Sequence, residues 1–492
     1  MTCYEVQLAH MSEQIKVLFL AAEADPFVKV GGLGDVAGSL PRALRTLSPE
    51  ATGNVTVDVR LAIPFHPVLR SKAVSLRPIE PFSIRRGDEE IIVEAFETTL
   101  DGMPVYFIGG GPIDTSSSVY SAKPDIDGEK YTFFSLAALG LIKQIDWTPD
   151  VVHANDWHTA LIPYGLLVQH WQEGQPRPAS LITVHNLPFQ GPDIDKVLEA
   201  YDVPLAQTDL PDWARLKPLP LGLWASDAIV AVSPTYADEM LSSDYGSGLN
   251  EFLNARREDL TGILNGLDVD SFDPSTDSDI AAQFTAESLD GRVANKIALT
   301  ERFGLRTSTA VPLMGVVSRM DPQKGIDLVL DALRKLGDKI SWQAIILGTG
   351  DPKLEEAAQR LMKDFPGRVC IETKYDSKLA RQIYAGADIF LMPSRYEPCG
   401  LSQMIAMRYG CIPVVRAVGG LHDTVTDGET GFVFIRPRVR DFTAAIHRAL
   451  AKYDDKETWR GMQKNGMRQD FSWTNSALKY FELYQQLISN KT

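Results

Sequence analysis

The chain has 492 residues, of which 44% are hydrophobic and 23% charged, and its formal net charge is -15 at pH 7. At roughly 100–200 residues per domain, this length predicts about two to four domains, and the ordinary composition excludes a fibrous or disordered chain. The negative charge argues against nucleic acid or an anionic membrane as the main partner, because both require a basic surface.

The apolar runs, the first residues and the cysteines all bear on where in the cell the protein is expected. No apolar run approaches the roughly 18–20 residues of a membrane helix, and residues 1–14 lack the basic start and apolar stretch of a signal peptide. The cysteines form no CxxC pair and are too few for a disulfide framework: Cys3, Cys370, Cys399 and Cys411. We therefore expect a cytoplasmic protein with reduced thiols and no membrane partner.

In the first half of the chain, short β-rich runs alternate with longer amphipathic stretches. Residues 15–21 predict a buried strand, the glycine-rich segment 29–34 follows it, and 35–46 has apolar residues at helical spacing. Near-continuous apolar strands between helices indicate a parallel sheet covered on both faces. Further strands are expected at 56–62, 104–109, 151–154, 180–184 and 228–233.

A second series of similar design begins near residue 312. The turn-rich segment 265–279 before it is expected to be a hinge, and 474–489 has the pattern of an amphipathic helix. Ligands of open α/β sheets bind at the carboxyl ends of the strands, so two such domains would place these ends on either side of a cleft. Strands are expected at 312–318, 342–347, 369–372, 389–392 and 412–416, and helices at 325–336, 352–363 and 377–386.

The glycine-rich segment, residues 29–35 (KVGGLGD), lies between a predicted strand and a predicted helix. Adjacent glycines let backbone N–H groups approach a phosphate, a helix N-terminus favours negative charge, and Lys29 adds a positive charge. The segment matches neither the Walker P-loop nor the G-x-G-x-x-G dinucleotide pattern. Its position favours a phosphate site over a simple tight turn.

Two polar clusters follow strands of the first series, at residues 153–158 (HANDWH) and 183–186 (TVHN). Their spacing is not that of a zinc-binding helix, so we do not expect them to bind a metal. Lone histidines are usually structural. The alternative is that one of these histidines faces the cleft as a hydrogen-bonding group.

In the second series, Arg319 and Lys324 follow the strand at 312–318. Two cations at this edge could neutralise a diphosphate leaving group, although a solvated surface pair fits the spacing equally well. The D-x-D sequence at 268–270 resembles a metal motif, but its turn-rich surroundings favour a solvated turn.

A carboxylate and a pair of glycines also follow strands in this half. Glu397 lies between proline and glycine in residues 393–402 (PSRYEPCGLS), a strand-to-helix loop that is well placed for chemistry. Gly419 and Gly420 precede a short helix and could offer backbone N–H groups to a second phosphate.

Together these segments resemble the glycogen and starch synthases, which are retaining glucosyltransferases of the GT-B fold. The resemblance runs from Lys16 to Tyr484 and is carried by KVGGLGDV, HANDWH, VHNLPFQG, VSPTYADEM, YGSGL, GILNGLDVDSFDP, VSRMDPQKG, LGTGD, PSRYEPCGLSQ, GGLHDTV and FSWTNSALKYFELY. It implies an α/β architecture with two Rossmann-like, doubly wound parallel-sheet domains facing a cleft. The acceptor domain would span 14–264 and the donor domain 265–470, with a C-terminal helix at 471–492 returning to the N-terminal domain.

The resemblance also implies roles for particular residues. Glu397 would lie against the transferring glucose, His158 would hydrogen-bond the sugar, and Arg319 and Lys324 would hold the diphosphate; we take these four as the catalytic group. Tyr375 falls where the family stacks a ring on the nucleotide base. The donor-binding residues implied in full are Lys29, Gly31, Gly32, Asp35, Asn265, Tyr375, Cys399, Gly400, Ser402, Gly419, Gly420 and Leu421.

The implied reaction moves glucose from ADP-glucose, or from UDP-glucose, to the non-reducing 4-hydroxyl of an α-1,4-glucan. It would need no metal or other cofactor and would proceed with retention by front-face attack. The sequence departs from the family in its acceptor half, with Asn155, Lys130 and Pro220 at positions where the family has histidine, arginine and lysine. Two alternatives therefore stay open: a related transferase with a small or oligosaccharide acceptor, and a non-catalytic glucan-binding homologue.

Overall fold

The computed structural model describes residues 13–71, 75–174, 176–337 and 340–491. The chain forms two compact units: unit 1 comprises Met1–Val232, Ala237–Gly266 and Trp473–Thr492, and unit 2 comprises Ser233–Tyr236 and Leu267–Ser472. The main chain thus passes into unit 2 after Gly266 and returns after Ser472. Cys3 and most of the segment tested for a signal peptide lie outside the described residues.

Unit 1 is built on a mixed sheet with the strand order β10-β9-β8-β7-β1-β2-β6-β5-β3, and β4 pairs with β5. The neighbours from β10 to β6 are parallel. The strands are β1 (Gln14–Leu20), β2 (Thr56–Pro64), β3 (Arg77–Pro78), β4 (Phe82–Arg86), β5 (Glu89–Leu100), β6 (Met103–Gly109), β7 (Val151–Asn155), β8 (Ala179–Val184), β9 (Ala228–Ala231) and β10 (Leu260–Gly262).

One edge of this sheet differs from the parallel arrangement expected from the sequence. Strand β5 runs antiparallel to β3, β4 and β6. The reason is local: Asp101 and Gly102 both have positive φ, 48° and 77°, and link β5 to β6 by a two-residue turn. Such a turn can join only antiparallel strands, since parallel strands need a long crossover.

Both faces of the unit 1 sheet are buried, as the apolar strands predicted. Along β1, Val17 and Phe19 pack into one core while Leu18 and Leu20 pack into the other, which follows from the alternation of side chains along a strand. The helices in this part of the chain are α2 (Gly32–Arg45), α3 (Pro49–Thr52), α4 (Pro67–Arg70), α5 (Gly111–Thr115), α6 (Pro124–Gln144), α7 (Leu161–Glu173), α8 (Asp195–Ala200), α9 (Pro218–Ala225), α10 (Pro234–Met240) and α11 (Asn250–Ala255).

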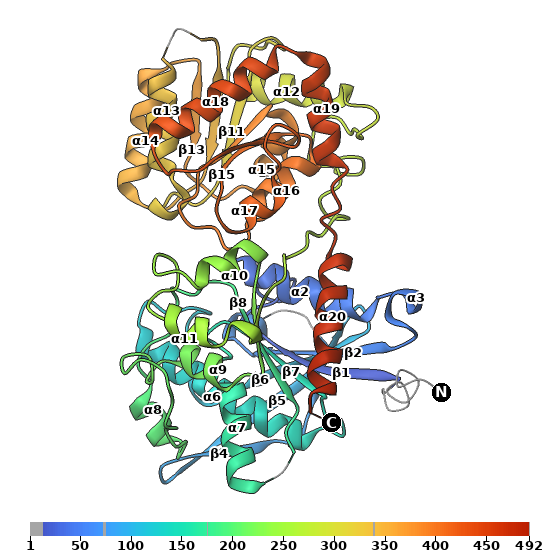
Figure 1. The fold of residues 1–492 in the computed structure, drawn as a ribbon, viewed down its shortest axis with the longest axis vertical. Helices are drawn as coiled ribbons and strands as arrows, with labels where there is room; N and C mark the ends of the chain where they lie inside the picture. Colours follow the sequence, from blue (N-terminus) through green and yellow to red (C-terminus); the bar gives the residue numbers. More distant parts are fainter. Residues whose placement is uncertain (1–12, 72–74, 175, 338–339, 492) are drawn as a thin grey trace. The chain divides into compact units, whose positions relative to one another are not determined.

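The C-terminal helix α20 (Trp473–Ser489) belongs to unit 1, as predicted. It packs against α2, and its aromatic side chains join the core that also contains Val17 and Phe19 (Figure 1). The Tyr484 hydroxyl lies 2.7 Å from Nδ1 of His153 on β7. The returning helix is therefore part of this core.

Unit 2 contains a parallel sheet with the order β13-β12-β11-β14-β15-β16. Counted from β11, this is the 3-2-1-4-5-6 order of dinucleotide-binding folds, with a ligand crevice expected at the carboxyl ends of β11 and β14. The strands are β11 (Leu313–Val317), β12 (Gln343–Leu347), β13 (Val369–Glu372), β14 (Ile389–Met392), β15 (Ile412–Arg416) and β16 (Phe432–Phe434).

Helices cover both faces of this second sheet (Figure 1). Helix α13 packs on α14 and α18, while α12 packs on α15. No helix in the described part of the chain is long and apolar enough to cross a membrane. The helices of unit 2 are α12 (Asp290–Arg302), α13 (Ile326–Leu336), α14 (Pro352–Asp364), α15 (Ser377–Gly386), α16 (Ser402–Arg408), α17 (Gly419–Thr424), α18 (Val439–Tyr453) and α19 (Lys456–Met467).

Candidate active site

The carboxyl ends of β11 and β14 bring together a lysine and a glutamate that were predicted from separate motifs. Nζ of Lys324 donates to both carboxylate oxygens of Glu397, at 2.9 and 2.7 Å. The Ser394 hydroxyl donates to the same carboxylate at 2.9 Å. The side chains of Lys324 and Glu397 are only 17% and 7% exposed, so a charged pair stands at the predicted crevice with little water around it.

The turn after β11 explains why Lys324 points this way. Asp321 caps the short 3-10 helix Pro322–Lys324, its Oδ1 accepting the Lys324 N–H at 2.9 Å. Gly325 then turns the chain with φ of 69°, and a Cβ atom there would lie 2.4 Å from the Pro393 carbonyl oxygen. Glycine is therefore required for the β11 turn to pack against the loop that carries Glu397.

Arg319 occupies a different setting. Its side chain is 69% exposed and forms an ion pair at 3.2 Å with Asp321. The structure thus places Arg319 at the end of β11 as predicted, but in solvent and without a contact to Glu397 within the described residues. Because the Arg319 guanidinium is exposed to solvent, it can turn toward an anionic ligand at a small cost in free energy.

The glycine pair that begins α17 packs against the Glu397 loop. A Cβ on Gly419 would lie 2.1 Å from the Glu397 carbonyl oxygen, and one on Gly420 would lie 2.2 Å from that of Cys399. The Gly420 N–H donates to the Pro398 carbonyl at 3.1 Å, and the Leu421 N–H donates to the Val418 carbonyl at 3.1 Å. These amides, which the sequence suggested for phosphate, bind the chain itself in this structure.

Other predicted residues of unit 2 line the same loop or lie apart from it. Cys399 is buried, Gly400 has φ of 74°, and Ser402 begins α16 with its side chain hydrogen-bonded to Tyr384. Tyr375, in the loop between β13 and α15, is 87% exposed. An exposed ring of this kind is available for stacking.

In unit 1, the glycine-rich loop is held by a carboxylate that the sequence reasoning missed. Glu23, three residues beyond β1, is 1% exposed and accepts the N–H groups of Val30 and Gly31. The Tyr120 hydroxyl also donates to it at 3.0 Å. Burial raises the pKa of this carboxyl, and its hydrogen bonds partly oppose that rise. The signal for Glu23 was an acidic residue three positions after the first strand.

The other predicted residues of this loop are placed toward solvent. Nζ of Lys29 pairs with Asp35 in the first turn of α2, and the two side chains are 43% and 31% exposed. A Cβ atom on Gly32 would meet nothing within 4 Å, whereas one on Gly31 would lie 3.5 Å from the Glu23 carboxylate. The space beside Gly32 can therefore admit another molecule.

His158 lies behind a wall of aromatic rings. The rings of Tyr120, Tyr131 and Trp157 have centroids 5.0, 4.6 and 4.2 Å from that of His158. Burial, and to a lesser extent the nearby Lys130, holds the pKa of His158 well below its usual range. The ring is therefore neutral at pH 7.

Four side chains that follow parallel strands of unit 1 hold buried polar atoms with no hydrogen-bond partner among the described residues. They are Nδ1 of His66 after β2, Nδ1 of His158 after β7, Oδ1 of Asn186 after β8 and Oδ1 of Asn265 after β10. Unsatisfied buried polar atoms are costly, so their presence at one sheet edge indicates a site for a hydrogen-bonding ligand. Asn186 belongs to the polar cluster at residues 183–186, to which no particular site role was assigned.

The departures from the family pattern now have structural roles. Asn155 bridges two segments, with Nδ2 donating to the Leu20 carbonyl at 3.0 Å and Oδ1 lying 2.9 Å from Nε2 of His185. Asp156 accepts the His185 N–H at 2.7 Å, and burial raises the pKa of its carboxyl. Lys130 is buried and forms an ion pair at 2.6 Å with Asp127.

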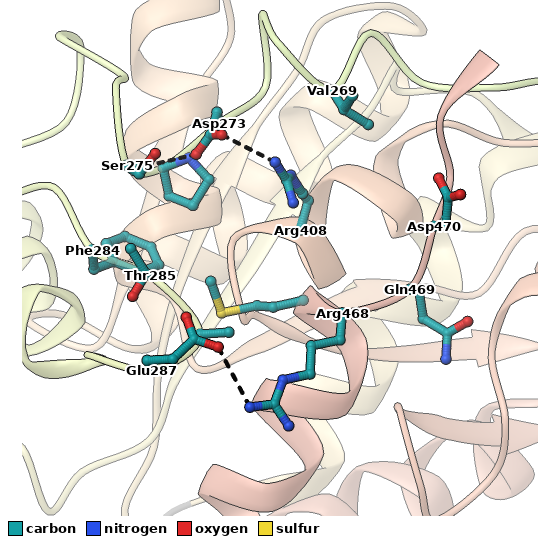
Figure 2. A pocket seen from close by; sticks show the side chains of 13 residues that line it. Val269, Asp273, Ser275, Phe284, Thr285, Glu287, Arg408, Arg468, Gln469 and Asp470 are labelled. Atoms are coloured by element: carbon teal, nitrogen blue, oxygen red, sulfur yellow. Dashed lines mark hydrogen bonds and ion pairs between the residues drawn. The ribbon is translucent and has the colours of Figure 1, made fainter. Parts of the chain in front are cut away.

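A separate cavity of about 460 Å³ lies in unit 2 and shares no lining residue with the predicted site. Two ion pairs cross its wall, Arg408 with Asp273 and Arg468 with Glu287 (Figure 2). The D-x-D aspartate Asp268 lies nearby in sequence and accepts the Ser271 N–H in a turn. In the described ranges, no group of three or more His, Cys, Asp or Glu side chains is arranged to hold a metal ion.

Two Rossmann-like units, one with a lysine–glutamate pair at its switch point, define a glycosyltransferase of the GT-B class. Residues 16–255 match the family model described as "Starch synthase catalytic domain", and 299–468 match "Glycosyl transferases group 1". The chain belongs to the glycogen and starch synthase family. It is 38% identical to the glycogen synthases of Streptococcus sanguinis and Thermotoga maritima, over 96% of this chain and 100% and 99% of theirs.

Solved structures agree with this assignment. The catalytic domain of starch synthase IV from Arabidopsis thaliana, bound to ADP and acarbose, is 32% identical with a TM-score of 0.85, covering 97% of this chain and 100% of that one. A sucrose-phosphate synthase from Thermosynechococcus elongatus is 20% identical with a TM-score of 0.61, covering 97% of this chain and 100% of that one. The latter likeness concerns the fold alone.

Proposed function

We propose that this glycosyltransferase moves glucose from ADP-glucose to the non-reducing 4-hydroxyl of an α-1,4-glucan. The observation that carries the proposal is the Lys324–Glu397 pair at the end of β11 and β14. The likeness to a starch synthase bound to ADP supports the donor, and the glycogen synthases among the relatives support the acceptor.

Glycosyl transfer passes through a state that is positive at the sugar and negative on the departing diphosphate. In this proposal Lys324 and Arg319 stabilise the leaving diphosphate, while Glu397 lies against the positive sugar. Because Lys324 donates hydrogen bonds to both carboxylate oxygens of Glu397, the two side chains hold each other in place before the donor binds. Preorganised charge of this kind costs no rearrangement during the reaction.

We assign front-face attack with retention. The bond between the anomeric carbon and the phosphate oxygen breaks, and the acceptor 4-oxygen forms its bond on the same face. The leaving phosphate takes the proton of the acceptor hydroxyl. His158, neutral because burial lowers its pKa, offers a hydrogen bond to the sugar without adding positive charge.

The test incubates the protein with radiolabelled ADP-glucose or UDP-glucose, with and without glycogen, and follows polymer labelling and released nucleotide. Labelled polymer with ADP-glucose is the expected result, and the UDP-glucose arm measures donor preference. Small labelled products would instead indicate a different acceptor, and no turnover with either donor would indicate a non-catalytic glucan-binding protein. Because arginine and lysine supply the charge, we propose that activity persists in EDTA.

A further inference from the structure

The anion-binding amides of the glycine-rich loop are already occupied by the chain's own carboxylate. Both oxygens of Glu23 lie within hydrogen-bond distance of the Gly31 nitrogen, at 3.2 and 3.1 Å, and one of them also accepts the Val30 N–H. Successive backbone N–H groups converging on one point form a nest for an anion. In this loop the anion is Glu23, which is 1% exposed.

We propose that Glu23 is a positioning residue that fixes the glycine-rich loop for catalysis and keeps the donor's phosphates off the Val30 and Gly31 amides. This inference rests on the proposed function and deepens it, because it assigns which side of the loop the nucleotide sugar uses. The donor is left with the open space beside Gly32 and with the Lys29 amine, which is paired with Asp35 in this structure. The loop thereby separates two functions: the Val30 and Gly31 amides hold Glu23, whereas Lys29 and the space beside Gly32 serve the donor.

Further contacts link Glu23 to the wall around His158. The Tyr120 hydroxyl donates to Glu23 at 3.0 Å, and the Tyr120 ring lies against His158 with a centroid separation of 5.0 Å. The segment before Tyr120 is itself anchored, since Nζ of the buried Lys130 donates to the Val119 carbonyl at 2.6 Å. Glu23 therefore joins the glycine-rich loop to the packing of the histidine assigned to the sugar.

Burial and hydrogen bonding give this arrangement its strength. Hydrogen bonds from N–H groups to a carboxylate are among the stronger ones in proteins, and their loss leaves the Val30 and Gly31 amides without this acceptor. Glutamine at this position retains the size of the side chain, but its carbonyl oxygen is neutral and therefore a weaker acceptor, and its NH2 group cannot accept from an amide at all. Aspartate retains the charge but is one methylene shorter, so it cannot reach both amides in the same way.

The first experiment needs no substrate. Hydrogen exchange followed by mass spectrometry on peptides covering residues 24–36 compares wild type with Glu23→Gln and with Tyr120→Phe. We expect exchange at the loop amides to become about tenfold faster or more in Glu23→Gln, from the loss of at least one charge-assisted bond. Tyr120→Phe is the matched control, because it removes the third hydrogen bond of the carboxylate while leaving both amide contacts, and its loop exchange should stay near wild type.

The second experiment measures kcat and the donor KM of the same variants with ADP-glucose and glycogen. We expect kcat/KM to fall about tenfold or more in Glu23→Gln, with Glu23→Asp recovering part of the loss. A lower donor KM in Glu23→Gln would overturn the proposal, because it would mean that the donor competes with Glu23 for the amides. Unchanged loop exchange in Glu23→Gln would overturn it too. A wild-type protein inactive with both nucleotide sugars would refute the proposed function, while the exchange result would still decide the role of Glu23.

Discussion

At the scale of single residues, Lys324 and Glu397 are joined by two hydrogen bonds and are both largely buried, so each side chain needs the other as its counter-ion. Lys324 and Glu397 each neutralise the other's charge, so the removal of one leaves the other buried without a counter-ion. The same pair is the centre of the proposed chemistry. Its variants therefore report on stability and on catalysis together, and the two effects must be separated by the choice of substitution.

Glu397→Ala and Glu397→Gln make that separation. Both should lower kcat by about 10²–10³-fold, because both remove the negative charge beside the sugar. Glutamine keeps the shape and one acceptor oxygen for Lys324, so its melting temperature should fall less than that of the alanine variant. Steady-state kinetics, thermal unfolding and ADP titration measure the three quantities. We expect ADP binding to be largely retained, and near-normal turnover in either variant would refute the assigned role of Glu397.

Two glycine-to-alanine changes form a second matched pair. Gly420→Ala places a Cβ 2.2 Å from the Cys399 carbonyl oxygen, so the Glu397 loop must shift and both stability and activity should fall. Gly32→Ala meets nothing within 4 Å, and alanine favours a helix more than glycine does, so stability should be unchanged or slightly higher. If the donor approaches the loop beside Gly32, this variant should nonetheless show a raised donor KM. A normal donor KM would show that the ligand approaches elsewhere.

Buried histidines make the stability of unit 1 depend on pH. Burial lowers the pKa of His66 from 6.5 to about 4, and it also lowers those of His153, His158 and His185. Since the unfolded chain binds these protons near pH 6.5 and the folded chain does not, stability is full above that pH and is lost as the pH falls below it; for His66 the loss continues down to about pH 4. The raised pKa of the Glu23 carboxyl acts in the opposite direction, because folding then favours its protonated form.

Urea unfolding between pH 8 and 5 measures this dependence. We expect the free energy of unfolding to fall below pH 6.5 by up to about 1.4 kcal/mol per pH unit for each such histidine. His66→Gln keeps a donor for the Ala22 carbonyl, which His66 contacts at 2.9 Å. This variant should reduce the slope of the free energy of unfolding against pH by the amount that corresponds to about one bound proton. An unchanged slope in this variant would exclude His66 as a contributor.

Much of the site was predictable from the sequence because its residues follow strands. Lys324 and Glu397 were both placed correctly at strand ends, yet no spacing rule indicated that they would bond to each other across 73 positions. Glu23 and Tyr120 were missed for the same reason, since their contact joins residues 97 apart. The two glycines at the start of α17 were expected to face a phosphate, whereas their packing against the loop from Glu397 to Cys399 became visible only in three dimensions.

At the scale of elements, strand prediction succeeded where both faces of a strand are buried. The apolar runs identified β1, β2, β6 to β9 and β11 to β15, whereas β3, β4 and β5 were missed. Strand β5 mixes polar and apolar residues, and only Val93 and Ala95 along it are buried, so it lacks the continuous apolar run used to find parallel strands. The strands β10 and β16 have three residues each and are too short for such a pattern.

The hydrogen bond between Tyr484 of α20 and His153 of β7 is expected to stabilise unit 1. Tyr484→Phe removes the hydroxyl that lies 2.7 Å from Nδ1 of His153 and leaves that nitrogen buried without its partner. The expected cost is about 1–3 kcal/mol in unit 1. Urea unfolding monitored by hydrogen exchange of peptides from β7 and α20 measures it. Phe481→Leu, in the same helix, changes packing without a hydrogen bond, and its effect should not depend on His153. Additive effects of Tyr484→Phe and His153→Gln would contradict the coupling.

At the scale of the whole molecule, the two units differ in how many separate segments of the chain build them. Unit 2 is nearly continuous, from Leu267 to Ser472 apart from a four-residue segment, whereas unit 1 needs residues from both ends. The core that contains Val17 also contains Trp473, Ala477 and Tyr480. Removal of the last helix should therefore affect unit 1 more than unit 2.

A chain ending at Ser472 tests this. We expect it to lose the cooperative unfolding of unit 1, since the sheet face beneath α20 would be open to water, while unit 2 remains protected. Hydrogen exchange of peptides from β1 and β11 distinguishes the units. Addition of a synthetic peptide covering 473–491 should restore part of the protection in β1. Equal protection of β1 in the full and shortened chains would refute a structural role for α20.

The return of the chain also sets an order of events during synthesis. Domains generally fold as units while the chain emerges from the ribosome with its N-terminal end first. Here the unit that contains the first strand cannot close its core until Tyr484 has been made, although the unit encoded in the middle is already complete. The growing chain must therefore carry an open apolar face on its sheet from the synthesis of β10 until that of α20, and we expect this interval, rather than the finished protein, to be most exposed to aggregation.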